Sequence, residues 1–149
     1  MQLIIGSHNK ATHDLANTIL PCKVFNLSIT PEEQIEETHQ RMKTKFHPDG
    51  GDWQRWYLPR TAMVFIDNTP KKSIAQRREI AYERANQALQ AYWQGMEGTL
   101  DPQKISKAVN NALVGTPEDI VEQIRERFHP EDRLMLWFDF FNHNNEQIK

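Results

Sequence analysis

Four short segments of almost continuous apolar, β-branched or aromatic residues most constrain how this chain can fold. They comprise residues 3–6, 22–27, 62–66 and 133–138. Strands with one face in water alternate between apolar and polar side chains, whereas strands covered on both faces are apolar throughout. The four segments therefore predict a parallel sheet whose strands are buried on both faces.

Amphipathic helical patterns separate these segments. Apolar residues recur at helical spacing within residues 11–19, 35–46, 74–92 and 120–128, and a weaker pattern covers 102–111. His39 lies on the same face as Ile35 and Met42. The alternation of strands and helices predicts an α/β fold with right-handed crossovers between parallel strands.

Three Thr-Pro pairs predict helix starts, because Thr is a good N-cap and Pro suits the first helical position. The threonines are Thr30, Thr69 and Thr116. Glu33 follows Thr30 at the position that completes a capping box, whereas Asp119 holds that position after Thr116. The full capping-box pattern is therefore expected only at Thr30.

Four parallel strands leave two open sheet edges, and a closed (β/α) barrel needs eight strands. The first strand segment begins within the first three residues, and the last is followed by a short polar tail. We therefore expect residues 1–149 to form a single domain that is either a small open sheet or half of a larger architecture.

Charge and cysteine content exclude several classes of protein. Among 149 residues, 18 are Lys or Arg and 20 are Asp or Glu, so the formal net charge is −2. This balance disfavours nucleic-acid binding and a polybasic membrane anchor. The single cysteine, Cys22, is expected to be an inert core thiol. Because no signal peptide and no membrane-spanning apolar run is evident, we expect a cytoplasmic protein.

The most informative candidate site is the stretch from Gly6 to Thr12, which leads from a strand into a helix. In parallel α/β folds, ligands bind where the carboxyl ends of the strands meet, and a helix N-terminus suits a phosphate. Ser7 and Thr12 offer hydroxyl groups, Lys10 adds positive charge, and His8 is a candidate contact. Ordinary helix capping is the alternative explanation.

The histidines and several aromatic residues could take part in binding, but structural roles explain them more simply. The histidine spacings do not match a metal-binding helix, so no metal site is expected. Trp53, Trp56 and Tyr57 favour core packing or a subunit interface over ligand stacking. Phe140 and Phe141 suit strand packing, with an apolar pocket wall as the alternative.

Three stretches resemble the bacterial luciferase-like flavin monooxygenases. Residues 111–124, which contain Gly115-Thr116-Pro117-Glu118, resemble the region of that family that leads into its eighth barrel strand. Residues 3–16 resemble its fifth strand and following helix, and residues 65–70 its seventh strand and the next helix start. The order and spacing agree along essentially the whole chain.

The resemblance implies the parallel four-stranded half of a (β/α)8 TIM barrel, containing strands five to eight. It implies a flavin cofactor, FMN or a deazaflavin, and a small-molecule substrate. Ser7, His8, Asn9 and Thr12 correspond to the flavin phosphate site, and Asn26 lies near the flavin ring in the family. The catalytic residues are not identified by this resemblance.

The family's first four strands have no counterpart in this chain, and they carry much of the active site. One hypothesis is a flavin-dependent oxidoreductase that is active only when a second copy, or a partner with strands one to four, completes the site. The alternative is a non-catalytic truncated member that self-associates and binds flavin, or another phosphate-bearing ligand, weakly or not at all.

Overall fold

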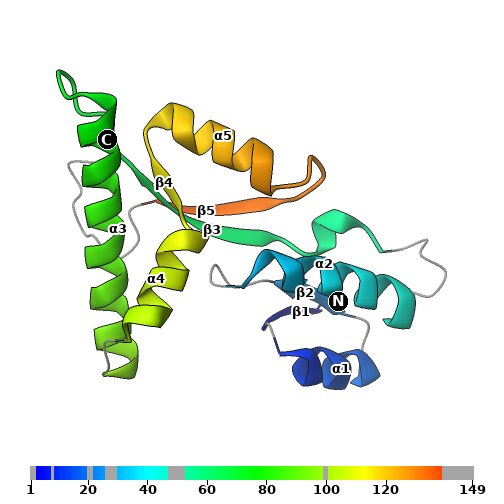
Figure 1. Ribbon diagram of the computed structural model, residues 1–149. Helices are drawn as coiled ribbons and strands as arrows, with labels where there is room; N and C mark the ends of the chain where they lie inside the picture. Colours follow the sequence, from blue (N-terminus) through cyan, green and yellow to red (C-terminus); the bar gives the residue numbers. More distant parts are fainter. Residues whose placement is uncertain are drawn as a thin grey trace. The chain divides into compact units, whose positions relative to one another are not determined.

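A computed structural model describes residues 3–7, 9–19, 22–25, 30–46, 53–98 and 101–138 (Figure 1). The chain divides into two compact units. The first unit comprises Met1–Thr61 and His129–Met135, and the second comprises Ala62–Phe128 and Leu136–Lys149. The expectation of a single domain stays a prediction, and each unit is described by itself.

The first unit begins with a parallel β-α-β arrangement. Its elements are β1 (Leu3–Gly6), α1 (Lys10–Ile19), β2 (Cys22–Phe25), α2 (Glu32–Arg41), the π-helical segment η1 (Met42–Phe46) and the 3-10 turn η2 (Arg55–Tyr57). Strands β1 and β2 pair in parallel, with Leu3 opposite Cys22 and Gly6 opposite Phe25. The carboxyl ends of both strands therefore lie at the same edge, as predicted from the sequence.

One face of α2 and η1 supplies the core of the first unit. Ile35 and Met42 pack with Trp53 and Leu58, and Phe46 and Tyr57 lie against this cluster. His39 shares the buried face and is 7% exposed. The predicted apolar face of this helix is therefore confirmed.

The second unit is built around the buried strand β3. Its elements are β3 (Arg60–Ile66, which begins in the first unit), α3 (Ile74–Glu97), α4 (Pro102–Asn111), β4 (Leu113–Gly115), α5 (Pro117–Arg127) and β5 (Leu134–Phe138, which also begins in the first unit). The sheet order is β4-β3-β5, and β3 and β4 are parallel. Helix α5 packs on one face, where Ile120 joins Val64 and Leu113 in a buried cluster (Figure 1).

Strand β4 was not predicted from the sequence. Its three residues are too few to show a periodic pattern, and they form a strand because they pair with β3, with Gly115 opposite Ile66. The outer edge of β4 is occupied by a side chain. Gln123 Nε2 donates to the carbonyl oxygen of Val114 at 2.9 Å, and Val114 N donates to Gln123 Oε1 at 3.2 Å. The side-chain amide thus replaces a neighbouring strand at this edge.

Only one of the three Thr-Pro predictions is confirmed as a helix cap. Thr116 caps α5 and forms a capping box with Asp119. The prediction of a full box at Thr30 is wrong, because α2 follows Pro31 without a side-chain cap and Thr30 is buried. The capping box therefore forms with Asp119 at Thr116, and not with Glu33 at Thr30.

The predicted helix start at Thr69 is wrong for a different reason. Asp67, at the carboxyl end of β3, accepts hydrogen bonds from both the backbone N–H and the hydroxyl of Thr69. This local bonding competes with helix formation and favours a turn. Helix α3 instead begins after Ser73, which forms a capping box with Gln76.

At Gly115 the backbone lies so close to the side chain of Asp119 that there is no room for a Cβ atom. Its φ angle is +146°, and a Cβ atom placed there would lie 2.6 Å from Asp119 Oδ2. Because that carboxylate is also the capping group of α5, it has little freedom to move. The glycine therefore lets the chain pass directly from β4 into the capped helix.

We expect Gly115→Ala to destabilise the fold by about 2–4 kcal/mol, because backbone strain adds to the steric overlap. The matched control is Gly95→Ala, in the last turn of α3, where an added Cβ meets no atom within 4 Å. This control should stabilise the protein by about 0.5–1 kcal/mol. Urea unfolding measures both changes, and a Gly115→Ala variant as stable as the parent would contradict the geometry.

Candidate functional site

The loop between β1 and α1 is organised by hydrogen bonds within it. Asn9 N donates to Ser7 Oγ at 3.0 Å, and Ala11 N donates to Asn9 Oδ1 at 2.9 Å. Asn9 therefore caps α1, as its place directly before the helix favours. Because Ser7 Oγ accepts a bond, its own hydroxyl proton can be donated to a ligand. Thr12 lies in the first turn and is exposed.

A buried histidine on α1 binds the backbone of this loop. The side chain of His13, on α1, is completely buried, and its Nε2 lies 2.7 Å from the carbonyl oxygen of Ser7. Its Nδ1 faces the guanidinium of Arg41, which can only donate. The ring is therefore the neutral tautomer that carries its proton on Nε2 and donates it to Ser7. Neither His13 nor Arg41 was singled out from the sequence, because their contact joins residues 28 positions apart.

Charged side chains from α2 and η1 also bind the start of α1. Arg41 donates to the carbonyl oxygen of Lys10 at 3.1 Å and to Asp14 at 2.9 Å. A hydrogen bond from Lys45 lowers the pKa of the Asp14 carboxyl group. The ammonium of Lys10 pairs with Glu37, so its charge is already partly balanced. The first turn of α1 contains no acidic residue, which leaves this helix end favourable to an anion.

The structure brings together three of the five predicted site residues. Ser7, Asn9 and Thr12 lie within the described loop and the first turn of α1. His8 and Asn26 lie outside the described residues, as do Phe140 and Phe141. The roles expected for these four therefore remain predictions.

The aromatic residues that precede β3 have structural roles. Trp53 is buried, and it makes edge contacts with the rings of His39 and Tyr57. Trp56 is partly exposed, and its ring lies beside Lys23 Nζ and the Arg133 guanidinium. These contacts favour the core-packing interpretation of this cluster.

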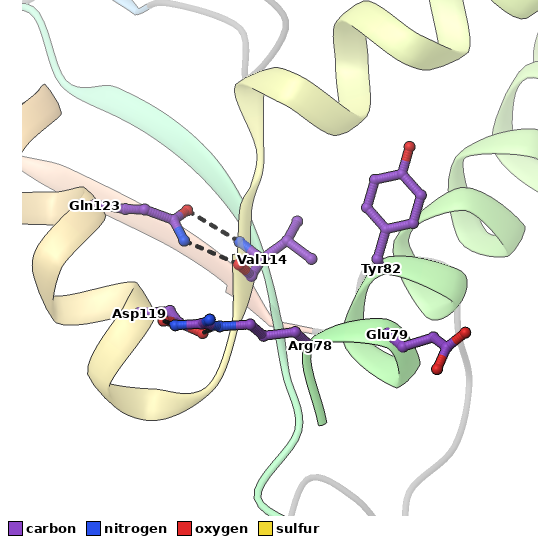
Figure 2. A pocket seen from close by; sticks show the side chains of 6 residues that line it. All are labelled: Arg78, Glu79, Tyr82, Val114, Asp119 and Gln123. Carbon is purple, nitrogen blue, oxygen red and sulfur yellow. Dashed lines mark hydrogen bonds and ion pairs between the residues drawn. The ribbon is translucent and has the colours of Figure 1, made fainter. Parts of the chain in front are cut away.

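A surface cavity of about 480 Å³ lies in the second unit, between α3 and α5 (Figure 2). Arg78 and Asp119 meet there in two hydrogen bonds of 2.8 and 2.6 Å. The bonds from Arg78 hold the pKa of Asp119 well below its usual range. Because Asp119 also belongs to the capping box of α5, the charges of Arg78 and Asp119 are satisfied by each other and by that box. The Gly-Thr-Pro-Glu stretch, residues 115–118, therefore has a structural role in starting this helix.

A second cavity, of about 300 Å³, lies within the first unit. It is lined by Glu36, His39, Gln40, Lys43, Trp53, Gln54, Arg55 and Glu131. Burial lowers the pKa of His39 from 6.5 to about 4, so the imidazole is neutral near pH 7. Neither ring nitrogen has a hydrogen-bond partner. The sequence placed His39 on the buried face but gave no sign of this cavity.

Comparison with known structures shows a similar fold. The chain is similar to the monooxygenase RslO1 from Streptomyces bottropensis, with a TM-score of 0.60 and 18% sequence identity. The match covers 91% of this chain and 40% of that chain, so the chain spans less than half the length of RslO1. This likeness and the parallel strand pairs confirm the α/β fold class and are consistent with half of a (β/α)8 TIM barrel.

No family model and no curated protein sequence matches the chain. Across the described ranges, no helix has the length and apolar character needed to cross a membrane. Among these same residues, no group of three or more His, Cys, Asp or Glu side chains could hold a metal ion.

We expect His39 to make folding stability depend on pH. Its pKa falls from 6.5 to about 4 on folding, so stability is complete above about pH 6.5 and is lost as the pH falls toward 4. The loss is at most about 3 kcal/mol. Glu36, Asp132, Arg55 and Arg60 surround the ring electrostatically. The two carboxyl groups also stabilise the fold less in acid, but the unfolded chain protonates them mainly below about pH 5.

Urea unfolding at a series of pH values separates these contributions. In His39→Gln, the slope of stability against pH between about pH 6.5 and 5 should flatten, because the titrating ring is gone. An unchanged slope in His39→Gln would refute the assignment.

Proposed function

We propose that this chain is the carboxyl-terminal half-barrel of a luciferase-like, flavin-dependent monooxygenase, with the β1–α1 loop as its flavin phosphate site. The observation that carries the proposal is the loop itself. It ends in a helix N-terminus without acidic residues, and the neutral His13 holds it in place. The fold likeness to a monooxygenase structure supports the same assignment.

The side chains present fit a phosphate group. Ser7 and Thr12 can donate hydroxyl protons, the Asn9 amide can donate N–H, and the helix end adds backbone N–H groups. His8 and Asn26 are proposed as further contacts, the latter to the flavin ring. A bound flavin, FMN or a deazaflavin, would supply redox chemistry that no side chain provides.

A complete active site requires a second copy or a partner that carries strands one to four. Flavin-dependent monooxygenation needs a site from which water is excluded. Half of a barrel does not enclose a flavin. Among the described strands, β5 lies at the edge of its sheet, and Trp137 and Phe138 on it are 37% and 55% exposed. Burial of this edge by a second copy would cover apolar surface and give a two-fold dimer.

Size-exclusion chromatography with light scattering tests this proposal directly. With FMN added, we expect a dimer that carries flavin at a fixed ratio, followed through absorbance at protein and flavin wavelengths. Substrate screening would then follow. A flavin-free oligomer would favour the non-catalytic alternative, and a flavin-free monomer would contradict both parts of the proposal.

A charge introduced at the loop tests the phosphate site. Ser7→Asp keeps an acceptor for Asn9 N but places a negative charge beside the phosphate, so FMN affinity should fall at least about tenfold. Ser73→Asp is the matched control, because Ser73 caps α3 and aspartate caps equally well. FMN titration followed by fluorescence quenching measures both affinities.

A second variant separates loss of binding from loss of structure. Thr12→Asp adds a negative charge in the first turn of α1, which should stabilise the helix by about 0.3–1 kcal/mol while weakening FMN binding. If Ser7→Asp and Thr12→Asp both bind FMN as the parent does, the phosphate lies elsewhere. A Ser73→Asp protein with equally weakened binding would also count against the loop.

A further inference from the structure

Arg41, at the end of α2, binds three separate groups of the first unit. Its Nη1 donates to the carbonyl oxygen of Lys10 at 3.1 Å and to Asp14 Oδ1 at 2.9 Å, and its Nη2 donates to His13 Nδ1. The side chain of Arg41 is 17% exposed, so these bonds lie largely out of water. Because arginine holds its donors in one rigid plane, the three groups are fixed relative to one another.

The bond to His13 extends from Arg41 to the β1–α1 loop. The completely buried ring accepts from Arg41 at Nδ1 and therefore carries its proton on Nε2, which lies 2.7 Å from the carbonyl oxygen of Ser7. With the proton on Nδ1, the ring would turn a hydrogen toward Arg41 and a lone pair toward the carbonyl oxygen. Both contacts would then be repulsive. Arg41 therefore selects the form of His13 that can bind the loop.

Ser7 is held by hydrogen bonds to two of its oxygen atoms. Its carbonyl oxygen accepts from His13, and its hydroxyl oxygen accepts from Asn9 N at 3.0 Å. The same hydroxyl group is one of the proposed donors to the flavin phosphate. A loop that is fixed in advance binds more tightly than one that becomes ordered on binding, because the entropy of ordering is already lost. The form of the His13 ring should therefore affect phosphate affinity without any contact between His13 and the phosphate.

We propose that Arg41 and His13 are positioning residues for this phosphate site. Arg41 sets the tautomer of His13, and His13 holds Ser7 in the geometry that binds the phosphate. This inference rests on the proposed function, since it concerns the same loop. It adds that a residue of α2, acting through a buried histidine, controls how tightly the loop binds its ligand.

The tautomer is measured first, because it does not depend on any ligand. Imidazole ¹⁵N NMR spectra of the parent should show His13 protonated at Nε2 and not at Nδ1, with its signals assigned through their loss in His13→Gln. Arg41→Lys keeps the positive charge, but an ammonium group does not reproduce the planar set of donors. In this variant we expect the Nδ1-protonated form of His13 to become populated.

Flavin titrations then measure the effect on binding. FMN and riboflavin differ only in the phosphate, so the ratio of their affinities reports on the phosphate contacts. We expect Arg41→Lys to lower this ratio at least about fivefold, as for the loss of one hydrogen bond that orders the loop. Riboflavin affinity should stay the same, because riboflavin has no phosphate to lose contact with the loop.

The matched control for Arg41→Lys is Lys45→Met. Lys45 Nζ binds the same carboxylate, Asp14 Oδ2, at 2.9 Å, whereas both ring nitrogens of His13 are occupied by Ser7 and Arg41. This control removes a positive charge but keeps the bonds of His13. The affinity ratio should change less than about twofold, because salt screens an exposed charge. Equal losses in Arg41→Lys and Lys45→Met would overturn the proposal.

Two substitutions of His13 separate positioning from the filling of space. Glutamine can donate through its amide nitrogen and accept through its amide oxygen, as the neutral ring does, whereas methionine has no donor. His13→Gln should therefore keep the affinity ratio at least about threefold higher than His13→Met does. Far-UV circular dichroism and riboflavin binding show whether both variants are folded. A role in packing alone predicts equal ratios for the two variants.

The outcomes distinguish this inference from the proposed function. A parent protein that binds FMN no better than riboflavin would contradict the phosphate site, and this inference with it. A parent that prefers FMN, with the same preference in Arg41→Lys and His13→Met, would overturn this inference and leave the phosphate site intact. A His13 ring that carries its proton on Nδ1 in the parent would also overturn it, whatever the flavin titrations show.

Discussion

The buried carboxylate of Asp132 connects segments of the first unit that lie far apart in the sequence. Its side chain is 1% exposed and binds Arg55 Nε and Arg60, while the backbone N–H of His129 donates to it at 3.0 Å. Burial opposes ionisation, yet hydrogen bonds from Arg55, His129 and Arg60 keep the pKa of Asp132 below its usual range. Since Arg55 also binds Glu36 on α2, one buried anion connects three distant segments of the chain. Without it, two largely buried guanidinium groups would lose a partner, which is a severe penalty.

The predictable parts of the fold are those that local pattern determines. The strand segments follow from their continuous apolar character, and the buried face of α2 with His39 follows from side-chain spacing. The start of α5 at Thr116 follows from the Thr-Pro pair. Strand β4 was missed because its conformation comes from pairing with β3. The start of α3 was misplaced because Thr69 donates hydrogen bonds to Asp67 instead of capping the helix, and this contact depends on where β3 ends.

In the candidate sites, too, the sequence predicted the features that depend on local sequence and missed those that depend on tertiary contacts. The sequence identified the β1–α1 loop, because a glycine, a serine and an asparagine between a strand and a helix are visible locally. It did not identify Arg41 behind His13, or the free nitrogens of His39, because these depend on which residues meet in three dimensions. The stretch that most resembles a known family, residues 115–118, serves helix capping and the Asp119–Arg78 pair.

Gln123 gives the sheet of the second unit two unequal sides. Its amide satisfies both outward-facing backbone groups of Val114, in the way that a neighbouring peptide unit would. A sheet that can accept a new strand on one side only can pair once and then has no side left for another copy. Such a sheet favours a closed pair of molecules and blocks head-to-tail growth into a filament. A single glutamine thereby limits how large an assembly formed through this sheet can become.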